Sequence, residues 1–206
     1  GRRQRLVCMR GRVIRLWTFL FIDRGIKGKE EDGRYQNLRR HFGSKCGEKF
    51  FYFFQGQALF VLFFSIPFFI VSTNLSPGLV VWDFLAIAIW SIAIVGEWIS
   101  DKQLASFRSN EVSKETVCKK GLWKYSRHPN YFFEWLHWWS YVALSVGSPL
   151  WWLALIGPIA MWYCLWKVTG IPYTEVQALK SRGDAYRVYQ KTTSPFFPWF
   201  PKESTE

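Results

Sequence analysis

Residues 50–71 read FFYFFQGQALFVLFFSIPFFIV, a run of 22 residues that contains no charged side chain. With a rise of about 1.5 Å per residue, a helix of this length reaches about 33 Å, which is enough to cross the hydrocarbon core of a bilayer. Pro67 lies near the far end of the run, where a kink is tolerated in a membrane helix. This stretch therefore predicts a membrane-spanning helix.

Further apolar segments predict additional membrane helices. Residues 79–99 form the second such segment. A longer apolar zone follows, and the turn signal Gly-Ser-Pro at 147–149 divides it into segments 131–146 and 150–166. The sequence thus predicts an all-α, multi-span membrane bundle with about four transmembrane helices.

Basic residues are confined to the connections outside these spans. All 27 Lys and Arg residues lie in segments 1–49, 100–128 and 167–206. An even number of spans places the three segments on one side of the membrane, and the positive-inside rule makes that side the cytoplasm. We therefore expect an integral protein of the bacterial inner membrane or the endoplasmic reticulum. A cytoplasmic N-terminal segment, residues 1–49, precedes a membrane-embedded domain, residues 50–206. Because the chain does not begin with Met, we also expect that an N-terminal part is missing.

The composition argues against several function classes. The formal net charge is +12, but a nucleic-acid-binding protein needs an exposed basic face without membrane spans. We therefore interpret the charge as basic loops beside a membrane, with no nucleic acid as partner. The four cysteines form no C-x-x-C pair, and the chain contains no H-E-x-x-H, P-loop or G-x-G-x-x-G motif. No metal site and no Rossmann-type cofactor site is expected.

Ionisable residues within the predicted spans are functional candidates, because a charge at membrane depth is costly. Asp83 lies near the predicted outer surface, where a solvated carboxylate is expected. Glu97, Asp101 and Arg108 recur at helical spacing, which places two carboxylates and an arginine on one helix face. A helix end with a local salt bridge is the structural alternative.

The richest polar segment is GLWKYSRHPNYFFEW, residues 121–135. Its proline suits the first turn of a helix, and the N-terminus of a helix favours an anion. Lys124, Arg127 and His128 add positive charge at that end. Polar and aromatic side chains continue from there into the span: Asn130, Tyr131, Glu134, His137 and Trp138. Such a stripe suits a cofactor with a charged tail and a flat head.

A third polar block follows the last predicted span. Glu175, Leu179 and Arg182 share one helix face, and Tyr186 follows at helical spacing. The tail at residues 195–201 is rich in proline and aromatic residues, which predicts a position at the membrane interface.

The segment KYSRHPNY at 124–131, with Glu134 and Trp138, resembles the C-terminal signature of the steroid 5α-reductase-like membrane proteins. The bacterial branch, catalogued as a domain of unknown function, is the most similar, and the likeness spans nearly the entire chain. Sterol reductases and the isoprenylcysteine and phospholipid methyltransferases share a similar Arg-His-Pro-x-Tyr core. The motif is specific for the superfamily and less specific for the reaction.

The resemblance implies a membrane-embedded, NADPH-dependent reductase of a conjugated C=C bond in a lipid or steroid-like enone. The residues that match cofactor contacts are Asp101, Asn130 and Glu134, with weaker matches at Arg108, Tyr131 and Tyr186. Tyr131 or a protonated Glu134 is expected to donate a hydrogen bond to the enolate oxygen that develops during reduction. The expected phosphate contacts are Arg108, Lys124, Arg127 and His128. The expected partners are membrane lipids and a hydrophobic small-molecule substrate.

Two alternatives remain open at this stage. The first is a lipid or small-molecule methyltransferase that uses S-adenosylmethionine, with Glu175 and His128 near the amine and carboxylate of the cofactor. The second is a membrane protein that keeps the scaffold without catalysis.

Overall fold

The computed structural model describes most of the chain after residue 38. The described segments are residues 39–76, 78–109, 116–168 and 170–202. They contain helices and turns but no strand, which confirms the prediction of an all-α protein. The chain divides into two compact units, residues 1–61 and 62–206. The division predicted after residue 49 stays a prediction.

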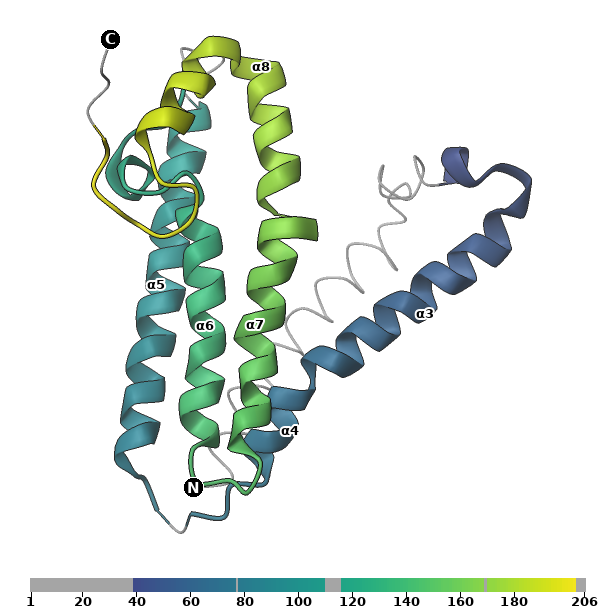
Figure 1. The fold of residues 1–206 in the computed structure, drawn as a ribbon, viewed down its shortest axis with the longest axis vertical. Helices are drawn as coiled ribbons and strands as arrows, with labels where there is room; N and C mark the ends of the chain where they lie inside the picture. Colours follow the sequence, from purple (N-terminus) through teal and green to yellow (C-terminus); the bar gives the residue numbers. More distant parts are fainter. Residues whose placement is uncertain (1–38, 77, 110–115, 169, 203–206) are drawn as a thin grey trace. The chain divides into compact units, whose positions relative to one another are not determined.

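The helices follow one another along the chain with short connections (Figure 1). The α-helices are α3 (Cys46–Phe64), α4 (Ile66–Ser72), α5 (Val81–Ser109), α6 (Pro129–Ser145), α7 (Ile156–Tyr163) and α8 (Ile171–Thr192). The shorter turns are the 3₁₀ turns η2 (Gly43–Lys45), η4 (Gly121–Lys124) and η5 (Trp151–Leu155), and the π-helical turn η6 (Cys164–Val168).

In the described part of the chain, three helical stretches are long and apolar enough to cross a membrane: Cys46–Ser72, Val81–Ser109 and Trp151–Thr192. The third stretch runs from η5 into α8, and its apolar part ends with η6 because α8 is rich in charged residues. Helix α6 is shorter, with 17 residues. A helical membrane protein is therefore supported, while the count of four spans and the cytoplasmic side of the loops stay predictions.

The first predicted span is interrupted near its end, as the position of Pro67 indicated. Helix α3 ends at Phe64 and α4 starts at Ile66, with Pro67 in its first turn. Proline has no backbone N–H to donate and its ring clashes with the preceding turn, so the two helices join through a turn at Ser65.

The start of α5 corrects the interpretation of Asp83. Its side chain is only 5% exposed, and a carboxylate oxygen accepts a hydrogen bond of 3.0 Å from the backbone N–H of Val80. This contact satisfies a donor at the N-terminus of the helix, as the acidic member of a capping box does. The prediction of a solvated carboxylate is therefore wrong, because Asp83 stabilises the helix start.

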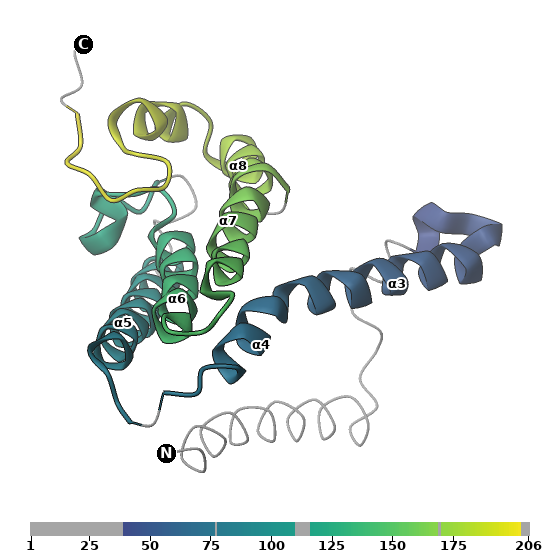
Figure 2. The same cartoon turned by 60° about the horizontal axis from the view of Figure 1, so that its bottom comes forward.

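Helices α5, α6 and α7 lie side by side, with α6 in the middle (Figures 1 and 2). Small residues on α5 allow the close contact with α6, since Ala86, Ala93, Gly96 and Ser100 are all buried. A side chain at Gly96 would collide with the ring of Phe133 on α6. Small residues at the interface are the usual means by which membrane helices approach one another.

The contact between α6 and α7 depends on Gly157. A Cβ at this position would lie 2.6 Å from the indole of Trp138 and 3.0 Å from the ring of Pro67. Trp138 in turn packs against Phe64, with ring centroids 5.0 Å apart, and against Phe68 at 5.9 Å. The indole therefore has little room to move away.

Helix α8 bends at Gly183, where the backbone adopts φ 51° and ψ −125°. This conformation is open to glycine and strained for other residues. The second half of α8 turns back from the first, and the C-terminal tail continues beside the segment that precedes α6 (Figure 1). In the tail, Phe196 is 1% exposed and packs against Phe132 and Trp135, so it belongs to the core rather than to the membrane interface.

We expect the change Gly157→Ala to destabilise the protein, because the new methyl group would displace Trp138 or Pro67. Overpacking of this kind costs about 1–3 kcal/mol. The measurement is the thermal unfolding midpoint of the detergent-solubilised protein. The matched control is Gly56→Ala on α3, where no atom lies within 4 Å of the new Cβ. Equal unfolding midpoints for the two variants would show that the contact between α6 and α7 can accommodate the extra methyl group at position 157.

Candidate functional site

The candidate site forms where the segment before α6 meets the C-terminal tail. Ser126, Arg127 and His128 are all buried. The backbone N–H of Arg127 donates to the carbonyl of Ser194 at 2.8 Å, and the hydroxyl of Ser126 donates to the carbonyl of Phe196 at 2.8 Å. The start of α6 is thereby fixed against the tail, with no hydrogen bond from the side chain of its N-cap residue, His128.

A buried ion pair joins this segment to α8. The guanidinium of Arg127 lies 3.1 Å from Glu175, and the two side chains are 9% and 17% exposed. His128 Nε2 lies 3.4 Å from the same carboxylate oxygen, and Gln190 donates to the other oxygen at 2.9 Å. Arg127, His128, Glu175 and Gln190 are called the Arg127 cluster below.

Electrostatics in the Arg127 cluster keeps Glu175 ionised. Burial on its own raises the pKa of the Glu175 carboxyl. The hydrogen bond with His128, the charge of Arg127 and the hydrogen bond from Gln190 outweigh burial, so the pKa lies below its usual value. Glu175 is therefore an anion at neutral pH.

Tyr131 extends the cluster along α6. Its ring stacks on the imidazole of His128, with centroids 5.3 Å apart and planes inclined by 9°. Its hydroxyl interacts with the side chain of Thr174, the residue before Glu175. A phenol is thus held beside the buried ion pair.

Carboxylates from α5 and α6 line the other side of Tyr131. Asn130 donates to Asp101 at 3.3 Å, which joins α6 to α5. Glu134, one turn after Asn130, is half-buried and lies within electrostatic range of Glu97 and Asp101. The structure thus brings together Glu97, Asp101, Asn130 and Glu134. Spacing predicts the α5 pair and the α6 pair separately, and the family resemblance implies that Asp101, Asn130 and Glu134 share one site.

Two arginines within the described residues have a buried Nε without a hydrogen-bond partner, Arg127 and Arg182. Both lie within electrostatic range of Tyr186, whose side chain is buried. Burial, followed by the charge of Glu175, raises the pKa of Tyr186 to about 12, so this phenol stays protonated. Buried donors without partners are costly, and an anion that accepted from them would remove that cost.

Two of the predicted phosphate contacts lie apart from the Arg127 cluster. Arg108 is exposed in the last turn of α5, about 10 Å along the helix from Asp101. Lys124 is exposed and lines a different pocket with Lys119 and Lys202. Of the four predicted phosphate contacts, Arg127 and His128 are the ones that the structure places beside Glu175.

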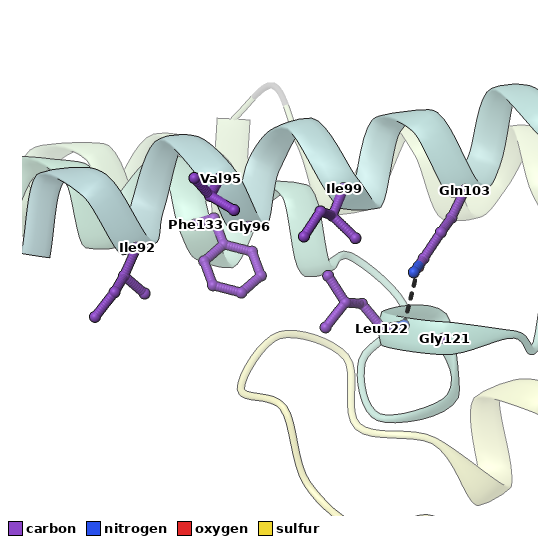
Figure 3. Close-up of a pocket in the computed structure, with 8 residues that line it drawn as sticks. All are labelled: Ile92, Val95, Gly96, Ile99, Gln103, Gly121, Leu122 and Phe133. Carbon is purple, nitrogen blue, oxygen red and sulfur yellow. Dashed lines mark hydrogen bonds between the residues drawn. The ribbon is translucent and has the colours of Figure 1, made fainter.

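An apolar pocket of about 410 Å³ lies along α5, α6 and η4. Figure 3 shows Phe133 beside Gly96, and Gln103 reaching toward η4. The backbone N–H of Leu122 donates to the side-chain oxygen of Gln103 at 3.0 Å. The lining contains no ionisable residue: Ile92, Val95, Gly96, Ile99, Gln103, Gly121, Leu122 and Phe133. This pocket suits an apolar chain and offers no proton donor for chemistry.

Several members of the site are not evident from sequence spacing. Gln190 lies 15 residues after Glu175 in the chain, and the bend at Gly183 separates the two halves of α8 that carry them. The spacing predicts Arg182 on the same helix face as Glu175 but does not predict that it belongs to the site. A glycine inside a helical pattern was the available signal for the bend. Within the described residues, no group of three or more His, Cys, Asp and Glu side chains could hold a metal ion.

Residues 5–193 match the model of a family described as a protein of unknown function, DUF1295. The match covers most of the chain, so the protein belongs to this family. No curated protein and no solved structure matches the chain. The match confirms the expected similarity to a family catalogued as a domain of unknown function. A relationship to the steroid 5α-reductases stays a prediction.

We expect Glu175→Gln to destabilise the protein at neutral pH by about 1.5–3 kcal/mol, because it removes a hydrogen-bonded charge from Arg127. In the parent, the pKa of Glu175 is lower when folded than when unfolded. Its stabilising contribution is therefore present above the unfolded-state pKa and is lost as the pH falls through the folded-state pKa.

The measurement is the denaturation midpoint from neutral to acidic pH. As the pH falls, the midpoint should decrease less in the Glu175→Gln variant than in the parent, because the variant has no carboxylate at position 175 to protonate. The control is Asp184→Asn, which breaks the exposed pair with Arg187 and should change stability by less than about 0.5 kcal/mol. If the two variants show the same denaturation midpoints at every pH, the ion pair between Arg127 and Glu175 does not contribute to the stability of the protein.

Proposed function

We propose that this DUF1295 protein is a membrane-embedded, NADPH-dependent reductase that acts on a conjugated C=C bond in a lipid or steroid-like enone. One observation carries the proposal. At the start of α6, the buried Arg127 has an Nε without a hydrogen-bond partner, and α6 itself carries the phenol of Tyr131 and the carboxyl of Glu134. Asn130 joins this helix to the carboxylate of Asp101 on α5. That arrangement suits a ligand with an anionic tail and a flat, reactive head.

The cationic half of the site favours phosphate groups. Arg127 keeps a free Nε beside its ion pair, and Arg182 presents another. The positive end of the α6 dipole adds to their attraction for an anion. Charge-assisted hydrogen bonds from arginine to phosphate are among the stronger polar contacts in proteins. In this proposal Arg127, His128 and Arg182 hold the phosphates.

The second half of the site positions the head group. Asn130 and Asp101 form a hydrogen-bonded pair that offers both a donor and an acceptor to a nucleotide. NADPH would supply a hydride, which adds to the β-carbon of the enone while the electron pair of the C=C bond moves toward the carbonyl oxygen. Tyr131 donates a hydrogen bond to that oxygen, and a proton from solvent or from Glu134 completes the saturated product at the α-carbon.

Aromatic side chains provide an apolar wall for the substrate. Trp138 lies one turn beyond Glu134 on α6 and packs against Phe64, Phe68 and Tyr141. A wall of flat rings within an apolar helical bundle is suited to a sterol or lipid. It also limits the access of water, which strengthens electrostatic effects at the reacting atoms.

A methyltransferase is the second candidate, and a separate observation favours it. Glu97, Asp101 and Glu134 place three carboxylates close together on α5 and α6. Such a group attracts a cation, and the sulfonium of S-adenosylmethionine is cationic. Glu175 would then lie near the amine of this cofactor. The two candidates differ in the tail, since S-adenosylmethionine carries no phosphate.

Ligand binding distinguishes the two candidates. We expect NADPH to raise the thermal midpoint of the detergent-solubilised protein, since a ligand at 100 times its Kd adds about 2.7 kcal/mol of stability. Asp101→Asn and Asn130→Ala should each weaken NADPH binding by about tenfold or more, which is about 1.4 kcal/mol. Asp184→Asn serves as the control and should bind normally. Stabilisation by S-adenosylmethionine alone would favour the methyltransferase, and stabilisation by neither ligand would favour a non-catalytic scaffold.

The role of Glu134 is tested by Glu134→Gln. The amide keeps the size of the side chain but cannot ionise or act as a general acid. We expect normal insertion and folding but at least about a tenfold loss of turnover, measured as enone-dependent oxidation of NADPH across a panel of lipid and steroid enones. Full turnover in this variant would remove Glu134 from the chemistry.

A further inference from the structure

A basic pocket lies on the side of the C-terminal tail, apart from the Arg127 cluster. It is an open surface pocket with a volume of about 290 Å³, lined by Lys119, Lys124, Thr192, Thr193, Pro201 and Lys202. The three lysines come from the loop before η4, from the end of η4 and from the tail. None of the described residues that line the pocket is acidic. Like charges gathered in this way repel one another, so an anion is favoured there.

Backbone contacts hold the walls of this pocket in place. The N–H of Lys202 donates to the carbonyl of Thr192 at 2.8 Å, and the N–H of Trp199 donates to the carbonyl of Tyr125 at 2.9 Å. The tail is thereby joined to the end of α8 and to the segment that carries Lys124. The backbone that forms the walls of the pocket is therefore held by hydrogen bonds.

Aromatic rings position the ammonium groups. Lys119 Nζ lies 5.9 Å from the ring centre of Tyr189, and Lys124 Nζ lies 5.9 Å from that of Tyr125. Tyr125 makes an edge contact with Phe200 in the tail, with centroids 5.9 Å apart. These cation–π contacts favour side-chain positions near the pocket.

The tail beside the pocket has the features of a membrane-surface element. Phe197, Trp199 and Phe200 are 51%, 71% and 76% exposed. Tryptophan and other amphipathic aromatic residues concentrate at the headgroup level of membranes. Exposed aromatic residues next to a lysine pocket point to an anion that is itself part of the membrane.

We propose that the pocket of Lys119, Lys124 and Lys202 binds the phosphate of an anionic phospholipid headgroup, while Trp199 and Phe200 insert at the membrane surface. This inference does not depend on the reductase proposal, because the pocket shares no lining residue with the Arg127 cluster. Free phosphate has the same chemistry, and the aromatic residues favour the lipid as its source. The pocket would fix the tail, which also carries Phe196, whose carbonyl accepts the hydrogen bond from Ser126.

The test uses the full chain in detergent, titrated with phosphatidylglycerol and with phosphatidylcholine of the same acyl chains, and bound lipid is counted by native mass spectrometry. We expect tighter binding of phosphatidylglycerol. A variant with Lys119→Gln, Lys124→Gln and Lys202→Gln should lose that preference by at least about tenfold, since each basic residue near an anionic surface contributes about fivefold. The matched control carries Lys102→Gln, Lys167→Gln and Lys180→Gln, which changes the net charge equally and should keep the preference.

Two further arms identify the source of the phosphate. The variant Trp199→Ala with Phe200→Ala should weaken phosphatidylglycerol binding, because it removes the interfacial rings but none of the lysines. Inorganic phosphate at constant ionic strength should not displace the lipid. Displacement by inorganic phosphate would overturn the lipid assignment in favour of a free anion. The proposal that this pocket binds an anionic phospholipid would be overturned by either of two results. One is an equal loss of phosphatidylglycerol binding in the two triple-lysine variants, and the other is equal binding of the two lipids by the parent.

Discussion

The ion pair between Arg127 and Glu175 is the contact on which the site depends. Neither charge is favourable where it lies unless the other is present, because removing one partner leaves an uncompensated charge in a poorly solvated place. The pair therefore requires the start of α6 and the start of α8 to meet. Gln190 adds the second half of α8 to the same carboxylate, so three separate parts of the chain have their positions set by one anion.

The bend at Gly183 allows that convergence. A straight α8 would carry Tyr186, Tyr189 and Gln190 away from Glu175, whereas the bend returns them toward the segment before α6. Tyr189 then donates to the carbonyls of Trp123 and Ser126, which supports the cluster from behind. The polar site and the tail are thus joined by hydrogen bonds between buried groups, where the low local dielectric strengthens them.

Features of the structure that depend on local sequence patterns could be predicted from the sequence. Features that depend on contacts between distant segments could not. The meeting of Asp101 with Asn130 is implied by the family resemblance alone, since helical spacing relates residues only along their own helix. The start of α6 at Pro129 follows from the motif, because proline suits the first turn of a helix. The burial of Phe196 and the pairing of Gln190 with Glu175 do not, since each depends on a backbone bend that periodicity cannot encode. The solvated carboxylate that the sequence predicts at Asp83 is wrong for a related reason. Position along a span indicates depth in the membrane, whereas the capping contact of Asp83 depends on the local backbone.

The charge layout separates the two candidate chemistries further. The site has a cationic end at Arg127 and Arg182 and an acidic end at Asp101 and Glu134. A ligand that spans both ends needs an anionic tail and a head that is cationic or becomes so. Both cofactors have such a head group. The sulfonium of S-adenosylmethionine is cationic, and the nicotinamide of NADPH gains positive charge when it gives up a hydride. Only NADPH brings phosphates to the arginines, and the unpartnered Nε groups there are the donors that phosphates would satisfy. On this physical ground we prefer the proposal of a reductase to that of a methyltransferase.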